Sequence, residues 1–153
     1  MAAAIRVAAN EDDLAAVWAV RRAVFVEEQE IPAELEYDEY DATSLHLLAV
    51  DEDGAPLGTA RLISGPEALA ITGGIQDRVL LGRLAVVPAA RGTGLGVRLV
   101  RAVEDLGRER GAKELELHAQ VRAMGFYERL GYAAHGPEYD DAGIAHRTMT
   151  RAL

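Results

Sequence analysis

At 153 residues, half of them hydrophobic and none of them cysteine, the chain is expected to form a single domain over residues 1–153. The lack of cysteine excludes disulfide bonds, thiolate metal sites and a cysteine nucleophile, and we expect no metal. No apolar run approaches the ~20 residues of a membrane span and no secretory signal opens the chain, so we expect a cytoplasmic protein without a membrane partner. A net charge of −9 without a basic stripe argues against a nucleic-acid partner.

One segment carries nearly all of the negative charge. Eight acidic residues and no basic ones lie between Glu27 and Asp41, which leaves −1 for the rest of the chain. Such a run is either a solvated surface segment or a negative mouth that attracts a cationic substrate. The sequence leaves both interpretations open.

The N-terminal half predicts two helices and three strands. Asn10, which precedes three acidic residues, is typical of a helix N-cap because its side-chain oxygen can accept from the first amides. Asp53-Gly54 between two strand-like runs is typical of a hairpin. The elements expected here are a strand at 5–8, a helix from residue 11 through Phe25, a short helix at 33–37, and strands at 45–50 and 57–63.

The C-terminal half alternates strands and helices. Residues 65–74 show no clear period, which predicts a loop. The elements expected after it are strands at 78–87 and 114–118, helices at 95–110 and 121–130, and a final hairpin of 132–134 and 144–150 around a turn-rich segment, 136–143. An antiparallel meander followed by strand-helix-strand-helix predicts an α/β (α+β) fold, in which a mixed sheet has helices on both faces.

The stretch from Leu81 to Val100 carries the clearest chemical pattern. It runs from an apolar strand through Pro88 and a turn with glycine at 92, 94 and 96 into an amphipathic helix. Glycines let a ligand approach the backbone, and the unpaired amides at the start of a helix favour negative charge. The pattern predicts a phosphate or pyrophosphate site, although a glycine-rich turn without a ligand would have the same residues.

The spacing of these glycines excludes two common phosphate motifs. No Lys-Ser/Thr pair follows them, as a P-loop requires, and Val97 stands where a dinucleotide fingerprint needs its last glycine. The stretch Arg91-Gly92-Thr93-Gly94-Leu95-Gly96 instead resembles the Q/R-x-x-G-x-G/A signature of the GNAT N-acetyltransferases, whose loop holds the pyrophosphate of acetyl-CoA.

A second motif follows roughly thirty residues later. Gly125-Phe126-Tyr127-Glu128-Arg129-Leu130-Gly131-Tyr132 resembles the F-Y-x-x-x-G-F/Y motif that closes the GNAT cofactor site. Three further segments resemble the ElaA-like branch of the family: Phe25–Gln29, His118–Gln120 and Gly143–His146. The resemblance covers essentially the whole chain, and it implies the GNAT acyl-CoA N-acyltransferase fold with a mixed, mostly antiparallel central sheet.

The resemblance also implies acetyl-CoA as co-substrate. The residues expected to bind it are Leu84, Ala85 and Val86 through the strand backbone, Arg91, Gly92, Thr93, Gly94, Leu95 and Gly96 in the loop, and Tyr127. Tyr127 is the expected general acid, because a phenol of pKa ~10 can protonate a thiolate of similar basicity. A tyrosine that only packs in its helix is the alternative.

Several residues are candidates for the base and for contacts with the acceptor. The candidate bases are Glu28, His118, Glu27 and His146, each of which could instead contact substrate or support the structure. Arg83 interrupts an otherwise apolar strand, and either contacts the acceptor or forms a buried ion pair.

Together these features predict an N-acetyltransferase that acts on a primary amine of a small molecule or peptide. Without cysteine no cysteinyl acyl-enzyme can form, which favours direct attack in a ternary complex. A non-catalytic acyl-CoA-binding regulatory module of the same fold is the alternative. A nucleotide-binding domain is disfavoured by the order of residues in the glycine-rich loop. A homodimer is compatible with the sequence.

Overall fold

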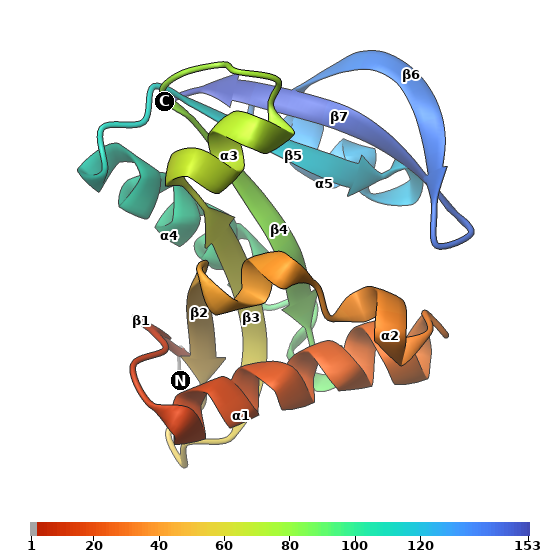
Figure 1. The fold of residues 1–153 in the computed structure, drawn as a ribbon. Helices are drawn as coiled ribbons and strands as arrows, with labels where there is room; N and C mark the ends of the chain where they lie inside the picture. The colour runs from red at the N-terminus through yellow and green to blue at the C-terminus, as the bar shows by residue number, and fades with distance from the viewer. Residues whose placement is uncertain (1–2) are drawn as a thin grey trace.

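The structure, a computed structural model, describes residues 3–153 and is built on one mixed sheet (Figure 1). Its seven strands lie in the order β1-β2-β3-β4-β5-β7-β6, and all neighbouring pairs are antiparallel except β4 and β5. The strands are β1 (Ala4–Val7), β2 (Leu45–Val50), β3 (Pro56–Ile63), β4 (Arg78–Val86), β5 (Glu114–Gln120), β6 (Ala133–Asp141) and β7 (Ile144–Ala152). The expected fold class is confirmed.

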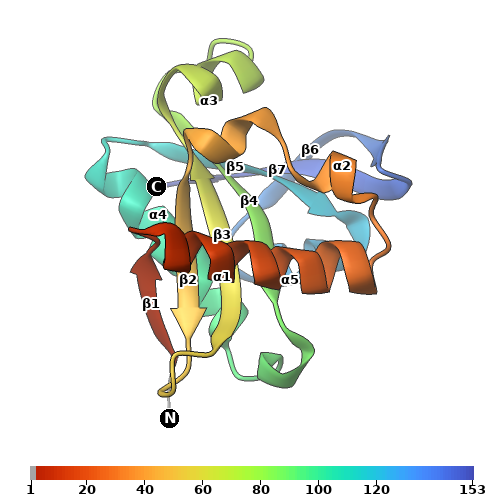
Figure 2. The same cartoon turned by 60° about the horizontal axis from the view of Figure 1, so that its bottom comes forward.

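Helices cover both faces of this sheet. Figure 2 shows α1 in front of the first strands and α4 behind them. The helices are α1 (Glu11–Arg21), which continues as the π-helix η1 (Arg22–Glu28), α2 (Ala33–Glu36), α3 (Gly65–Ile71), α4 (Leu95–Glu109) and α5 (Met124–Arg129). Short 3-10 turns lie at η2 (Glu39–Ala42), η3 (Pro88–Ala90) and η4 (Val121–Ala123).

Capping residues and turn glycines in the sequence mark several of these boundaries. The side chain of Asn10 accepts a hydrogen bond of 2.8 Å from the amide of Asp13, which confirms the N-cap of α1. Gly111 follows α4 with a φ of +81°, the left-handed conformation in which glycine commonly ends a helix. The predicted hairpin between β2 and β3 is also present.

Two predictions about the loops are wrong. Residues 65–71 form α3, whose start has Ser64 at the N-cap position and Pro66 in the first turn. Only Ala68 of this helix is buried, so the sequence lacks the apolar period that predicts a helix. The predicted turn-rich segment mostly belongs to β6, an exposed edge strand that tolerates Pro137 within an irregular register.

The core lies mainly between α4 and the middle of the sheet. The fully buried apolar residues of the helix are Leu99, Val100 and Val103, which recur with the spacing of one helical face. Gly58 on β3 lets α4 approach closely, because a Cβ there would lie 3.0 Å from Cδ1 of Leu99 and 3.1 Å from the carbonyl oxygen of Ala85. The absence of a side chain at Gly58 therefore sets the distance between helix and sheet.

The two parallel strands at the centre separate partway along their length. β4 pairs with β5 only from Arg78 to Leu81, opposite residues 114–117. Beyond that point β4 contains a bulge, where the register against β3 shifts and Arg83 adopts a φ of +51°. β5 stays paired to β7 as far as Gln120, so the second halves of β4 and β5 diverge and leave a gap between them.

The close approach at Gly58 makes a prediction about stability. Gly58→Ala should lower the free energy of unfolding by about 1–3 kcal/mol, because the added methyl overpacks a contact that includes rigid backbone. Gly82→Ala is the matched control, since a Cβ on that neighbouring strand would meet its nearest atom, Nη2 of Arg61, at an ordinary 3.7 Å. Denaturant unfolding measures both variants. Equal stability of the two proteins would contradict the proposed role of Gly58.

Candidate active site

The gap between β4 and β5 opens into two pockets that meet. One has a volume of about 140 Å3 and lies toward α2 and the β6–β7 hairpin, and the other has about 470 Å3 and lies toward the glycine turn. Four residues line both pockets: Phe25, Leu84, Gln120 and Tyr127. We call them the acceptor pocket and the cofactor groove, and the shared residues mark the place where ligands in the two could touch.

The diverging part of β4 directs backbone groups toward this gap. The amide of Val87 donates to the carbonyl of Leu57 on β3, at 2.9 Å. Because backbone groups alternate in direction along a strand, those of Leu84 and Val86 point away from β3 and toward the gap. The carbonyl of Val86 accepts a hydrogen bond from Nε of Arg91, which agrees with this direction.

The glycine turn lies at one end of the cofactor groove and contains a row of unpaired backbone amides. Gly92 and Gly94 adopt φ values of +77° and +82°, and an added Cβ at either would meet no atom within 4 Å. Gly94 occupies the N-cap of α4 without a side-chain cap. Within residues 3–153 the amides of residues 92–97 have no hydrogen-bond partner, so the groups needed to bind an anion are in place.

Arg91 and Glu28 form an exposed ion pair beside that turn. Both guanidinium Nη atoms of Arg91 donate to the Glu28 carboxylate, at 2.6 and 2.8 Å. The hydrogen bonds from Arg91 hold the pKa of Glu28 below its ordinary value. Glu28 lines the cofactor groove and not the acceptor pocket, and Glu27 lines neither, so their positions do not favour them as the base.

Tyr127 stands at the junction of the two pockets. Its ring is buried and packs edge-on against Phe126 and Tyr132. Burial raises the pKa of Tyr127 to about 12, so the hydroxyl keeps its proton at neutral pH. The hydroxyl forms no hydrogen bond to another residue in the described part of the chain, which leaves it available to a ligand.

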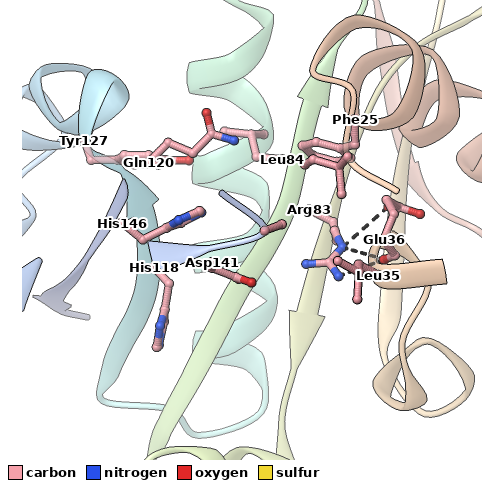
Figure 3. A pocket seen from close by; sticks show the side chains of 12 residues that line it. Phe25, Leu35, Glu36, Arg83, Leu84, His118, Gln120, Tyr127, Asp141 and His146 are labelled. Carbon is pink, nitrogen blue, oxygen red and sulfur yellow. Dashed lines mark hydrogen bonds and ion pairs between the residues drawn. The ribbon is translucent and has the colours of Figure 1, made fainter. Parts of the chain in front are cut away.

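Two histidines line the acceptor pocket with different surroundings. His146 places Nδ1 at 2.8 Å from the carbonyl oxygen of Ile144, which requires a proton on Nδ1 and leaves Nε2 as the acceptor nitrogen. Both ring nitrogens of His118 are engaged, Nε2 with Glu116 at 2.7 Å and Nδ1 with the Tyr139 hydroxyl at 2.5 Å. In Figure 3 the His146 ring points toward the centre of the pocket and the His118 ring points away from Tyr127.

The acidic segment is divided: Glu36 and Asp41 are buried, Asp38 is half-buried, and its other five acidic residues are exposed. Arg21 binds Glu36 and Asp41 at 2.6 Å, and Arg61 binds Asp38 and Asp41 at 2.7 and 3.0 Å. These groups, together with Arg83, form a buried cluster of three arginines and three carboxylates. Although burial opposes it, the hydrogen bonds from Arg21 and the Asp38 amide lower the pKa of Asp41 to about 2.

Arg83 joins this cluster to the acceptor pocket, so the predicted ion pair is present, and its contact with the acceptor stays a prediction. Its Nε and Nη2 donate to the carbonyl of Glu36, and Nη2 also contacts Asp38 at 3.2 Å. The same side chain lines the acceptor pocket, where Figure 3 shows it opposite His146.

Sequence reasoning missed three residues of the site. Gln29 accepts a hydrogen bond of 2.8 Å from Gln120 across the gap, and Tyr139 stacks on His146 while it contacts His118. Gln29 and Gln120 both lie within segments that resemble the ElaA-like branch, which is the signal that could have identified them. Tyr139 lies in the exposed edge strand, where no pattern in the sequence indicates a function.

Comparison with known proteins decides the family. A family model described as an acetyltransferase (GNAT) domain matches residues 8–153. The chain belongs to the GNAT acetyltransferase family. A protein of Bacillus subtilis strain 168 that is named as an acetyltransferase is 37% identical over 145 residues, which cover 93% of this chain and 91% of the relative.

Solved GNAT structures share the whole architecture. Escherichia coli ElaA superposes with a TM-score of 0.82 at 25% identity and covers 97% of this chain and 99% of its own. An acyl-CoA N-acyltransferase from Pseudomonas aeruginosa gives a TM-score of 0.77 at 30% identity, with 98% of each chain covered. The predicted resemblance to the GNAT family and to ElaA is confirmed.

The GNAT domain provides the groups that acyl-CoA needs. The amides of the glycine turn fit a pyrophosphate, and the backbone that β4 directs into the gap at Leu84 fits an extended amide-containing arm. Among residues 3–153 no group of three or more His, Asp or Glu side chains is placed to hold a metal ion, and no helix is long and apolar enough to cross a membrane.

The glycine turn predicts a selective loss of binding. Gly94→Ala should weaken the affinity for acetyl-CoA by roughly tenfold or more, because the side chain strains a left-handed residue and displaces amides that donate to the phosphates. Gly111→Ala is the matched control, since it has an equally positive φ and open space at the other end of α4. Calorimetry with coenzyme A measures both. Equal affinities of the two variants would refute the assignment of the turn.

Proposed function

We propose that this protein transfers an acetyl group from acetyl-CoA to a primary amine of a small molecule or peptide by direct attack in a ternary complex. The continuity of the cofactor groove and the acceptor pocket through Leu84, Gln120 and Tyr127 supports this function. A binding module would need only the groove, so a second pocket that meets it favours catalysis over acyl-CoA sensing.

In this proposal the backbone of β4 binds the acyl group. An amide directed into the gap at Leu84 donates to the carbonyl oxygen on which negative charge develops as the amine attacks. The amides of the glycine turn hold the pyrophosphate, and Arg91 is placed beside them. Acetyl-CoA supplies the activated thioester, and the protein supplies the orientation of the two reactants.

The proton transfers are assigned to two side chains. Nε2 of His146 takes the proton of the attacking amine, since His146 lines the acceptor pocket with Nδ1 already donating to a carbonyl. The N–C bond forms as the C–S bond breaks, and the hydroxyl of Tyr127 gives its proton to the leaving sulfur. His118 has both nitrogens bound to protein groups, and we assign it a supporting position in the pocket wall.

The role of Tyr127 is testable by removal of one oxygen. Tyr127→Phe keeps the buried ring, so acetyl-CoA affinity and thermal stability should change little. Turnover should fall by about 10²–10⁴-fold, as is typical when a general acid is lost. Steady-state thiol release gives kcat, and calorimetry gives the affinity. A variant with wild-type kcat would show that Tyr127 serves only packing.

The assignment of the base is tested by comparing the two histidines of the pocket. His146→Gln should lower kcat by about 10²–10⁴-fold while the Kd for acetyl-CoA stays the same, because the proton acceptor is lost and the cofactor groove is intact. His118→Gln is the control and should retain most of the activity. The reverse order of kcat for the two variants would move the base to His118.

A further inference from the structure

Arg83 has a guanidinium group that the protein leaves partly unbound. The bulge of β4 directs this side chain over α2, where Nε and Nη2 are occupied by the carbonyl of Glu36 and the carboxylate of Asp38. Nη1 has no hydrogen-bond partner among residues 3–153. The side chain is 26% exposed, and it lines the acceptor pocket.

The other charged groups at the acceptor pocket do not satisfy Nη1. Glu36 directs its carboxylate to Nε of Arg21 at 2.6 Å, and its nearest approach to Arg83 is a contact of 3.5 Å at Nε. Asp141 is exposed at the end of β6, and His118 and His146 lie on the same side of the gap as Asp141. A cationic group of the protein therefore faces the pocket with two N–H donors free.

The two walls of the pocket differ in chemistry. Figure 3 shows Arg83, Glu36 and Leu35 on one side, and Tyr127, His146 and Asp141 across the gap. The wall with Tyr127 and His146 contains the proposed acid and base, so the reacting amine belongs there. The facing wall presents the free N–H groups of Arg83, which match a carboxylate.

We infer that the acceptor is an amino-acid-like amine whose carboxylate binds Nη1 of Arg83 while its amine lies toward His146 and Tyr127. This inference rests on the proposed acetyl transfer and names the class of acceptor. It differs from the cationic acceptor that the acidic segment suggests, because Glu36, the acidic residue of that segment that lines the acceptor pocket, is already paired with Arg21. Arg83 is then a specificity-determining residue.

The experiment compares acceptors that differ only at the carboxylate. Wild-type protein and acetyl-CoA are assayed for thiol release with ω-amino acids of increasing chain length, each paired with its own primary amide. The amide keeps the amine and the length of the chain but removes the negative charge. For the chain length that fits the pocket, kcat/KM should be roughly 10- to 100-fold higher for the acid, which is typical of a hydrogen bond to a charged group.

Two variants assign the preference to one side chain. Arg83→Gln should reduce the ratio of acid to amide to near one while the affinity for acetyl-CoA is retained. Arg61→Gln is the matched control, because it removes one arginine from the same buried cluster but Arg61 does not line the acceptor pocket. It should keep the preference for the acid. If either variant fails to fold, the acid and amide pairs with the wild-type protein still decide the class of acceptor.

Different results separate the inference from the proposed function. Equal rates for acids and amides, or faster acetylation of diamines, would overturn the inference and leave acetyl transfer intact. Faster acetylation of aminoalkyl phosphates than of the matched carboxylates would also overturn it. If no amine releases thiol, the proposed function fails. Thermal melts with coenzyme A then test the inference alone, since only the acid of a matching pair should stabilise the protein.

Discussion

The loss of pairing between β4 and β5 is the constraint on which the site depends. A parallel pair is held by evenly spaced hydrogen bonds along its length, and here the pairing stops after four residues, next to a bulge. Arg83 holds a left-handed φ at that bulge, a conformation that costs a residue with a side chain about 1–2 kcal/mol. The divergence leaves backbone amides facing the gap, and both pockets open along it.

The buried arginine and carboxylate cluster holds the wall that faces this gap. Segment 33–42 leaves its apolar side chains Leu35 and Tyr37 exposed, and it is fixed over the sheet chiefly by Glu36, Asp38 and Asp41 binding to three arginines. Desolvation of six charges offsets much of their attraction, so such a cluster adds geometric definition more than stability. The arginines come from α1, β3 and β4, and the cluster therefore fixes the position of α2 relative to the strand that carries the free amides.

The fold and the backbone of the glycine turn could be predicted from the sequence because their information is local. Asn10, Gly111 and the glycines of the turn specify backbone conformations within a few residues of themselves, and the apolar face of α4 follows a simple period. The acceptor side could not be predicted in this way. The pairing of Arg21 with Glu36 and Asp41 joins residues 15 and 20 positions apart, and the pairing of Arg83 with Asp38 joins residues 45 apart. A run of acids looks the same in sequence whether or not arginines elsewhere neutralise it.

The incomplete pairing of Arg83 links the cluster to the chemistry of the pocket. Arg21 uses Nε, Nη1 and Nη2 within the cluster and is almost fully buried, which leaves it no capacity for a ligand. Burial and the nearby charge of Arg61 lower the pKa of Arg83, the opposite of the direction found for Arg21. The cluster thus has equal numbers of positive and negative groups, but its arginines differ in how many of their N–H groups are hydrogen-bonded. Arg83, whose Nη1 has no partner among residues 3–153, lies at the bulge where β4 and β5 diverge. A strained and desolvated cation that no protein group fully binds is the arrangement expected of a ligand-binding residue, because an anionic ligand relieves a penalty that folding alone leaves in place.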